Sequence, residues 1–255
     1  MRDRSQKSED RKLLKIRLDK LLLARNLAPT RQKAQALIVA GLVRVDGRPA
    51  DKPGTMFSSA CRIEVKGPSC PYVSRGGLKL EKGLEFFSID PAGLICADIG
   101  ASTGGFTDCL LQRHAAKVYA IDVGYGQLDW RLRQDERVVV MERTNARYLQ
   151  PGDIDMNLDL AVIDAAFISL KLLIPPLIPF FAGPVSILAL IKPQFEVGRG
   201  KVGKGGVVRD PDLHQEVIAD ILDFAKGLGL ADRGVTDSPI LGPKGNREFL
   251  VYFVG

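Results

Sequence analysis

The stretch Leu94-Ile-Cys-Ala-Asp98-Ile-Gly100-Ala-Ser-Thr-Gly104-Gly105-Phe106, followed by Val118-Tyr-Ala-Ile-Asp122-Val-Gly124, decides the fold of this chain. It predicts a buried strand, a glycine turn, a helix of about fifteen residues and a second buried strand that ends in a carboxylate. This is the first βαβ unit of a doubly wound α/β sheet. Ligands of such sheets bind beyond the carboxyl ends of the strands.

The turn after the first strand has the features of a ligand-binding loop. Glycine at 100, 104 and 105 lets the backbone turn tightly and approach a ligand closely. Asp98 and Asp122 are 24 residues apart, close to the spacing of about 20 at which a second-strand carboxylate meets a ribose. Ser102 stands where G-x-G-x-x-G requires glycine, which disfavours a dinucleotide. A strand–turn–helix unit without a ligand remains the alternative.

An acid before the first glycine and G-x-x-x-G-G after it resemble the S-adenosylmethionine turn of class I (Rossmann-like) methyltransferases. The resemblance implies that the turn shapes the methionine side of the pocket, and that Asp122 accepts hydrogen bonds from the cofactor ribose. Gly124 and Tyr125 would lie near the adenine. The candidate cofactor residues are Asp98, Gly100, Ala101, Ser102, Thr103, Gly104, Gly105, Phe106, Asp122, Gly124, Tyr125 and Asp164.

The charge of the chain is divided unevenly along its 255 residues. Residues 1–70 hold 16 Lys and Arg against 7 Asp and Glu, whereas the remainder holds 20 against 23. A chain of this length fits one domain of ordinary size plus a small one. The basic N-terminus therefore predicts a polyanion-binding module attached to a nearly neutral enzyme. A solvated basic face without a partner remains the alternative.

Cysteine usage and hydropathy predict a cytoplasmic protein. The four cysteines form no C-x-x-C pair, and only two histidines accompany them, so no zinc cluster is expected. The N-terminus lacks the apolar region of a secretory signal. Residues 172–191 are uncharged and long enough for a membrane span, but they contain four prolines. They are better interpreted as a short helix, a proline-rich turn and a buried strand over 185–191.

The N-terminal module follows a polar segment, 1–12, which is predicted to be a disordered arm. Leucines at helical spacing predict a helix over 17–25, and Thr30 offers an N-cap for a second helix over 31–38 that Gly41 ends. Residues 42–48 predict a strand that runs into an Asp-Gly hairpin, with 62–65 as the returning strand.

R-L-D-K-L-L from Arg17, T-R-x-x-A-x-x-L-I from Thr30 and G-x-V-x-V-D-G from Gly41 resemble an S4 domain, which is an RNA-binding module. The predicted boundaries are 13–66 for this domain, 67–75 for a linker and 76–255 for the catalytic domain. The resemblance implies RNA contacts by cations of the module, namely Arg17, Lys20, Arg25, Arg31 and Lys33.

The rest of the chain continues the α/β pattern. Ser74 and two glycines introduce a helix with Leu80, Leu84 and Phe87 on its apolar stripe, and Lys79 points off that stripe. The remaining elements are expected as strands over 138–141, 160–163 and 249–254, a glycine- and lysine-rich loop over 197–209 that could act as a lid, and a helix over 210–225.

Four charged residues are expected at one rim of the sheet. Asp164 and Lys192 stand just beyond the ends of two strands, Glu248 begins an antiparallel edge strand, and Lys79 lies on a helix that leads into the first strand. A ribose hydroxyl is a poor nucleophile. A lysine can assist it by orienting the oxygen, or, when neutral, by accepting the proton. Ordinary surface ion pairs remain the alternative for each residue.

Lys79, Asp164, Lys192 and Glu248 match, in order and context, the Lys-Asp-Lys-Glu tetrad of FtsJ-like ribose 2′-O-methyltransferases. S-R-G-G-x-K-L, V-I-D-A-x-F-I-S-L, I-K-P-Q-F-E-V-G and G-N-R-E-F are similar to the TlyA family. Members of that family were first called hemolysins and, where characterised, methylate cytidine 2′-hydroxyls of ribosomal RNA. One departure is Ala166, where serine is common.

The resemblance implies S-adenosylmethionine as cofactor, ribosomal RNA or ribosomal subunits as partner, no metal and no stable membrane association. Two other classes remain open. A membrane-active hemolysin would need an exposed apolar surface, and a non-catalytic RNA-binding ribosome-assembly factor would need no cofactor.

Overall fold

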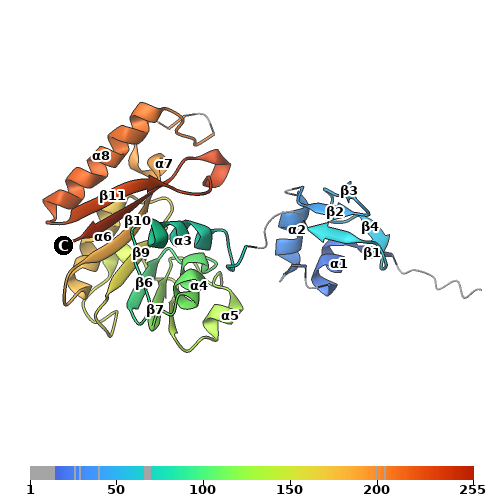
Figure 1. Cartoon of the computed structure of the whole chain (residues 1–255), viewed down its shortest axis with the longest axis horizontal. Coiled ribbons are helices and arrows are strands. Elements are labelled where there is room, and N and C mark those ends of the chain that lie inside the picture. Colours follow the sequence, from blue (N-terminus) through green and yellow to red (C-terminus); the bar gives the residue numbers. More distant parts are fainter. Residues whose placement is uncertain are drawn as a thin grey trace, which may run out of the picture. The chain divides into compact units, whose positions relative to one another are not determined.

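The computed structural model divides the chain into two compact units, Met1–Ser69 and Cys70–Gly255 (Figure 1). It describes residues 15–25, 27–28, 30–39, 41–65, 70–198, 200, 202–203 and 205–255. The predicted arm, 1–12, lies outside these residues, as do positions 67–69 of the predicted linker. The domain boundaries derived from the sequence stay predictions.

The N-terminal unit packs two helices against two small sheets. Antiparallel pairing joins β1 to β4 in one sheet, and the other sheet has the order β3-β2-β5. The buried side chains of Leu18, Leu22, Ile38 and Val43 belong to one core. The elements are β1 (Lys15–Arg17), α1 (Leu18–Ala24), α2 (Arg31–Val39), β2 (Val43–Val45), β3 (Arg48–Pro49), β4 (Met56–Ser58) and β5 (Ile63–Val65).

Both predicted helices of this unit are confirmed, but its hairpin differs from the prediction. The Thr30 hydroxyl accepts a hydrogen bond from the Lys33 amide at 3.1 Å, and Gly41 follows the helix with φ +70°. Asp46 and Gly47 both have positive φ, as a tight hairpin turn requires, and the strand that returns is β3. β5 instead pairs with the other edge of β2. β1 and β4 were not predicted, because β1 runs directly into α1 and β4, Met-Phe-Ser, lacks the alternation of apolar and polar side chains.

The larger unit is built on a seven-stranded sheet with the order β11-β12-β10-β9-β6-β7-β8. β12 is antiparallel to both of its neighbours, and the other adjacent pairs are parallel. The doubly wound α/β fold class is thereby confirmed. The strands are β6 (Ile95–Ile99), β7 (Lys117–Ile121), β8 (Val138–Met141), β9 (Leu160–Ile163), β10 (Ser186–Ile191), β11 (Ala231–Asp237) and β12 (Phe249–Val254).

Helices cover both faces of this sheet (Figure 1). Side chains of α3 and α4, such as Leu84 and Leu110, belong to one core, and side chains of α6 and α8, such as Leu173 and Ile221, belong to the other. Buried residues of the strands alternate between the two cores. The helices are α3 (Gly76–Phe86), α4 (Gly105–Gln112), α5 (Trp130–Arg133), η1 (Ala146–Tyr148), α6 (Leu170–Leu177), η2 (Ile178–Phe180), α7 (Pro193–Glu196), α8 (Pro211–Gly227) and η3 (Pro243–Gly245).

Two helices of this unit differ from their predictions. α4 spans 8 residues rather than about fifteen, because Gly104, at φ +95°, precedes it and His114, at φ +66°, follows its C-cap. Pro175 and Pro176 lie inside the last turns of α6 rather than in a turn after it. Inside a helix each proline removes an amide donor, and its ring crowds the carbonyl four residues earlier, which is why the sequence predicted a turn here.

β11 is an unpredicted edge strand, so β12 is internal rather than the edge that the sequence suggested. Its sequence, Ala-Asp-Arg-Gly-Val-Thr-Asp, is polar, and a bulge between Asp232 and Val235 interrupts the alternation of its side chains. Within the described part of the chain, every helix is too short or too polar to cross a membrane.

Candidate active site

The glycine turn and the loop after β9 meet at the point where the strand order reverses. From β6 the chain adds β7 and β8 on one side, and then β9 and β10 on the other, so the ends of β6 and β9 border the ligand crevice expected of such sheets. Gly100 has φ +87°, and a Cβ there would lie 2.9 Å from the Ala165 Cα. Only glycine fits this position, where the two loops approach at backbone distance.

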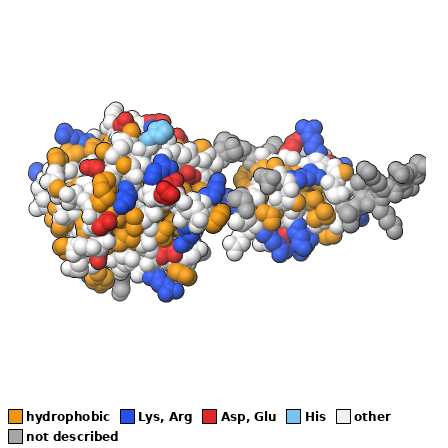
Figure 2. Space-filling model, turned by 90° about the horizontal axis from the view of Figure 1, so that it is seen from below, with side chains coloured by type: hydrophobic (Ala, Val, Ile, Leu, Met, Phe, Trp, Pro, Cys, Tyr) orange, Lys and Arg blue, Asp and Glu red, His pale blue; other side chains and the backbone are white. Residues whose placement is uncertain are grey.

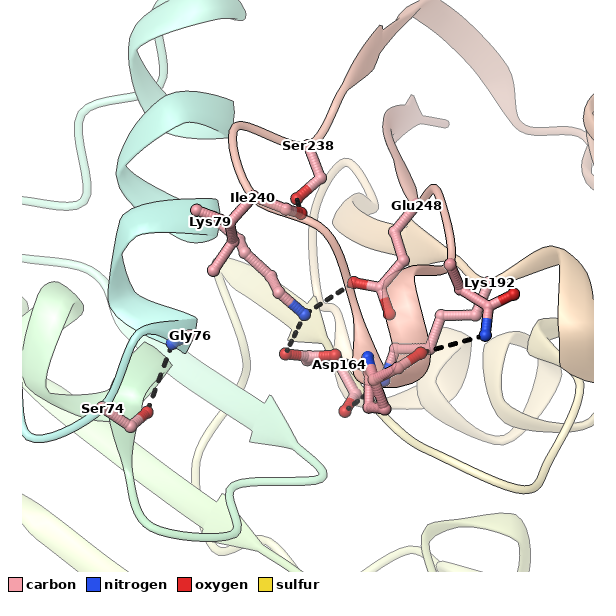
Figure 3. Close-up of polar contacts among 10 residues, drawn as sticks. Ser74, Gly76, Lys79, Asp164, Lys192, Ser238, Ile240 and Glu248 are labelled. Atoms are coloured by element: carbon pink, nitrogen blue, oxygen red, sulfur yellow. Dashed lines mark hydrogen bonds and ion pairs between the residues drawn. The ribbon is translucent and has the colours of Figure 1, made fainter. Parts of the chain in front are cut away.

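The four predicted catalytic residues converge in one chain of ion pairs (Figure 3). The Lys79 amine lies 2.6 Å from Glu248 Oε2 and 3.5 Å from Asp164 Oδ2. The Lys192 amine lies 2.6 Å from Asp164 Oδ1, and it donates to the Asp164 carbonyl at 3.2 Å. Asp164 therefore stands between two lysines, and the four side chains sum to zero formal charge.

These four residues are not ordinary surface ion pairs. Lys79 is 8% exposed, Lys192 7% and Glu248 2%. The alternative of an ordinary surface ion pair is wrong for Lys79, because its amine donates a buried hydrogen bond to Glu248. Burial of charge costs free energy even when the charges are paired, so a mostly buried cluster of ion pairs at the ends of the strands indicates a functional site.

The turn that precedes β12 packs closely on Glu248. A Cβ on Gly242 would lie 2.0 Å from Glu248 Oε1, so the backbone of this turn covers the carboxylate. Among the described residues, Oε1 has no hydrogen-bond partner, whereas Oε2 accepts from Lys79.

Asp122 ties the glycine turn to the end of β7. Its Oδ2 accepts from the Ser102 amide at 2.8 Å, and its Oδ1 accepts from the Gly124 amide at 2.7 Å. Each oxygen keeps a second lone pair. Ser102 and Thr103 are exposed, so this corner of the rim is open to a ligand.

Asp98 lies beneath the turn and is fully buried. Its Oδ2 accepts from the Thr107 amide at 2.9 Å and from the Thr107 hydroxyl at 2.7 Å, while Oδ1 has no partner among the described residues. Burial raises the pKa of Asp98 to about 7, although the two Thr107 donors act against this shift.

Several of the candidate cofactor residues are buried and pack against other parts of the catalytic unit. Ala101 and Phe106 are buried in the core shared by α3 and α4. A Cβ on Gly104 would lie 2.2 Å from Leu132, and one on Gly105 would lie 2.2 Å from the Ser74 hydroxyl. Tyr125, by contrast, is 69% exposed at the rim, and the Arg143 guanidinium lies 4.1 Å from the centre of its ring.

An aromatic pair beside the tetrad was missed from the sequence. Phe167 is 90% exposed, has φ +64°, and its ring centre lies 5.0 Å from that of Phe195. Each ring stands three residues after a tetrad member, Asp164 or Lys192. The sequence did contain a signal for this pair, because a phenylalanine follows both Asp164 and Lys192 at the same distance of three residues.

The five predicted RNA-contact cations of the N-terminal unit fall into two groups. Arg17 and Arg31 each lie 3.0 Å from the buried Asp19 carboxylate, and Arg25 donates to the Ser59 and Cys61 carbonyls. The Arg17 guanidinium lowers the pKa of Asp19. Lys20 and Lys33 are exposed, and their amines have no partner among the described residues. Figure 2 shows basic side chains at more than one place on this unit.

The catalytic unit has a cavity of about 290 Å³ that is not lined by the tetrad. Its lining includes no tetrad residue and consists of Val73, Asp108, Leu111, Gln112, Arg131, Leu132, Asp135 and Arg137. The converging charges, rather than the presence of a hollow, mark the candidate site.

Comparison with known proteins places this geometry in a family. A model described as FtsJ-like methyltransferase matches residues 72–254, and the S4 domain model matches residues 16–59. The 16S/23S rRNA (cytidine-2′-O)-methyltransferase TlyA of Mycobacterium tuberculosis is 50% identical over 239 residues, which cover 93% of this chain and 89% of the relative. Hemolysin A of Brachyspira hyodysenteriae is 40% identical, covering 94% of this chain and 100% of the relative.

A solved structure supports the same grouping. A Streptococcus thermophilus protein, provisionally assigned as a hemolysin, has a TM-score of 0.76 and 44% identity, covering 95% of this chain and 89% of that one. The chain therefore belongs to the FtsJ-like methyltransferase family and, within it, to the TlyA family.

Proposed function

We propose that this methyltransferase transfers a methyl group from S-adenosylmethionine to a ribose 2′-hydroxyl of ribosomal RNA, at a cytidine. The observation that carries the proposal is the largely buried chain of ion pairs Glu248–Lys79–Asp164–Lys192, beside the Gly100 turn. The substrate follows the relative named as an rRNA (cytidine-2′-O)-methyltransferase.

The residues around the turn fit this cofactor. The Asp122 oxygens each accept one backbone N–H and keep lone pairs for the ribose hydroxyls. A Cβ on Gly124 would lie 2.3 Å from the Gln127 side-chain amide and 3.0 Å from Asp122 Oδ1, so glycine is required where these two side chains pack against the turn. Ser102 and Thr103 would face the methionine moiety, and Tyr125 the adenine. When bound, the cofactor supplies a methyl group activated by its sulfonium.

Lys192 is assigned to the substrate hydroxyl. Asp164 holds the Lys192 amine through its carboxylate and its carbonyl, which fixes the direction of the amine. The amine then orients the hydroxyl oxygen and, when neutral, would accept its proton as the new O–C bond replaces the S–C bond of the sulfonium. Lys79 and Glu248 complete the charge balance around Asp164. The tetrad therefore acts as one unit.

The exposed ring of Phe167 is assigned to the target base. An aromatic side chain that is 90% exposed, three residues after Asp164, offers a stacking face next to the reacting ribose. Stacking of a base on an aromatic side chain stabilises a complex by about 1–3 kcal/mol. In the N-terminal unit, Lys20 and Lys33 are assigned to RNA phosphates.

The buried tetrad favours catalysis over the two alternatives. Three buried charges and the partly exposed Asp164 carboxylate reduce the stability of a fold that has no use for them. Neither a membrane-active protein nor a non-catalytic assembly factor would use them. A cytoplasmic location stays a prediction.

Replacement of Lys192 by methionine tests the proposal. We expect Lys192→Met to lower the single-turnover rate on ribosomal subunits by at least about 100-fold, because hydroxyl orientation and proton transfer are lost. Cofactor affinity, measured by calorimetry, should stay within about two-fold. Lys79→Met added to Lys192→Met should cost little more, since residues that act as a unit are not additive.

The matched control is Lys226→Met, which replaces an exposed lysine in the last turn of α8. It should leave both the rate and the cofactor affinity unchanged. A near-normal single-turnover rate for Lys192→Met would refute the assignment of the tetrad.

A further inference from the structure

Glu196 links the two loops that carry Asp164 and Lys192. It lies in α7, four residues after Lys192, and its side chain reaches the start of α6. Glu196 Oε2 accepts from the Ser169 hydroxyl at 2.5 Å, and Oε1 accepts from the Leu170 amide at 2.9 Å. Both carboxylate oxygens are therefore used in holding the end of the loop that follows β9.

Glu196 adds to the cap of α6 and, in doing so, joins two loops of the site. Ser169 already caps α6 by accepting from the Lys171 amide at 3.2 Å. The Leu170 amide is another of the unpaired amides at this helix end, and its acceptor, Glu196, comes from the loop after β10. Burial raises the pKa of Glu196, although its hydrogen bonds to Ser169 and Leu170 act against this shift.

Three contacts join the loop after β9 to the loop after β10. Lys192 pairs with Asp164, Phe195 packs against Phe167, and Glu196 bonds to Ser169. Phe167 lies in the chain between Asp164 and Ser169, which make the first and third of these contacts, and it has φ +64°. Its side chain is 90% exposed, so burial in the core contributes little to its position. Its place depends on how the loop is held at both ends, at Asp164 and at Ser169.

We propose that Glu196 is a positioning residue for RNA: by fixing Ser169 and Leu170, it holds Phe167 beside the Lys192 amine. This inference rests on the proposed function, in which Phe167 receives the target base. Glu196 does not touch RNA or cofactor. Its effect passes through the ring of Phe167, so it concerns RNA recognition rather than cofactor binding.

The first test compares Glu196→Ala with Glu196→Gln. Alanine removes both acceptors, and we expect the RNA concentration at half-saturation to rise by about 5–50-fold with cofactor affinity unchanged. Glutamine should restore most of the function, because its carbonyl can accept from Leu170 and its amide can donate to the Ser169 hydroxyl. Asp223→Asn, an exposed change from carboxylate to amide on α8, is the control.

The second test is a double-mutant cycle with Phe167→Ala. Because Glu196 acts through Phe167, adding Glu196→Ala to Phe167→Ala should raise the half-saturating RNA concentration by less than about two-fold. Losses that multiply, or a Glu196→Ala variant with lowered cofactor affinity, would overturn the inference and indicate a general structural role.

The failure modes of the two proposals are distinguishable. If the unmodified protein transfers no methyl group to RNA, the proposed function fails. If it does transfer a methyl group, but Phe167→Ala binds RNA normally, then the assignment of Phe167 to the target base and this inference are both wrong. If Phe167→Ala weakens RNA binding and Glu196→Ala does not, the inference alone is wrong.

Discussion

Asp164 is the residue on which the candidate site depends. It is the one tetrad member that contacts both lysines, and its backbone amide donates to Ile99 at the end of β6. Because its carbonyl also accepts from Lys192, the loop after β9 fixes the amine by two separate groups. The geometry of the tetrad therefore follows directly from the end of a buried strand.

At the same scale, Asp122→Ala should weaken S-adenosylmethionine binding by about 1.5–3 kcal/mol, which is roughly 10- to 150-fold. The substitution removes the acceptor for the cofactor ribose and also frees the Ser102 and Gly124 amides. Calorimetry measures the change. Unchanged affinity would place the adenosine end of the cofactor elsewhere.

Asp98 should make the stability of the catalytic unit depend on pH. Its pKa of about 7 in the folded state lies above the ordinary value of 3.8, so between about pH 4 and 7 the folded protein keeps a proton that the unfolded chain has lost. Stability should therefore fall as pH rises through this window, by up to about 4 kcal/mol, and level off above it.

Chemical unfolding of Asp98→Asn across this pH range checks the prediction. Asparagine cannot ionise, so the decline should be largely absent, whereas the exposed control Asp223→Asn should keep it. A decline of equal size in both variants would assign the pH dependence to other groups.

Among the elements, β12 decides where Glu248 lies. Its insertion between β10 and β11, antiparallel to both, brings its first residues to the rim where the parallel strands end. α3 supplies Lys79 to the same rim from before the first strand of the sheet. Elements from the beginning, middle and end of the catalytic unit thus build one site.

In the N-terminal unit, α1 is held to β1 and α2 by the buried carboxylate of Asp19. It accepts from Arg17, Arg31 and Gln35, all at 3.0 Å. Asp19→Ala should destabilise this unit by about 2–4 kcal/mol, because the network loses its common acceptor. Hydrogen exchange of the full chain should show faster exchange in α1 and α2, with the catalytic unit unaffected.

The same carboxylate should make this unit sensitive to acid. Arg17 lowers the pKa of Asp19, so the stabilisation is fully present above its ordinary value of 3.8 and is lost as pH falls below it. Opening of α1 and α2 at pH 3 in the unmodified protein, but no further opening in Asp19→Ala, is the expected pattern. Equal acid sensitivity in both would contradict it.

At the scale of the whole molecule, the excess of positive charge lies in the N-terminal unit and the tetrad lies in the catalytic unit. Residues 1–70 hold 16 basic against 7 acidic residues, and the rest hold 20 against 23. The catalytic unit has two apolar cores of its own, and the N-terminal unit has a third. A fragment of residues 70–255 should therefore fold and bind cofactor.

This fragment should bind RNA weakly. Each phosphate contact that the N-terminal unit makes adds to the salt dependence of binding, so RNA affinity of the full chain should fall steeply as salt rises. The fragment should show lower affinity and a flatter slope. Equal affinities and slopes across a salt series would mean that the basic N-terminus is only a solvated face.

Charge reversal separates RNA contact from folding in that unit. Lys20→Glu with Lys33→Glu should weaken RNA binding without loss of stability, because both amines are free of partners among the described residues. Reversal at Arg17 would instead place a carboxylate beside Asp19, so any loss of binding would include unfolding. Lys20 and Lys33 are therefore the informative positions.

The sequence by itself determined the architecture, and resemblance to FtsJ-like methyltransferases predicted the members of the tetrad. Long buried strands and glycine turns are local patterns, and β8, β9 and β12 begin and end where the sequence predicted. Asp164, Lys192 and Glu248 stand next to strand ends, which local periodicity locates. Lys79 lies on α3, and only the resemblance to FtsJ-like methyltransferases joined it to the other three.

Only the tertiary structure decided which charged groups are free and which are paired. Arg17 and Lys20 look alike in sequence, yet one faces Asp19 and the other faces solvent. Burial of Lys79, the contact of Glu196 with Ser169 and the edge position of β11 also depend on residues distant in the chain. Periodicity reports which face of an element is apolar, but the partner of a polar side chain is set by long-range packing, which spacing does not encode.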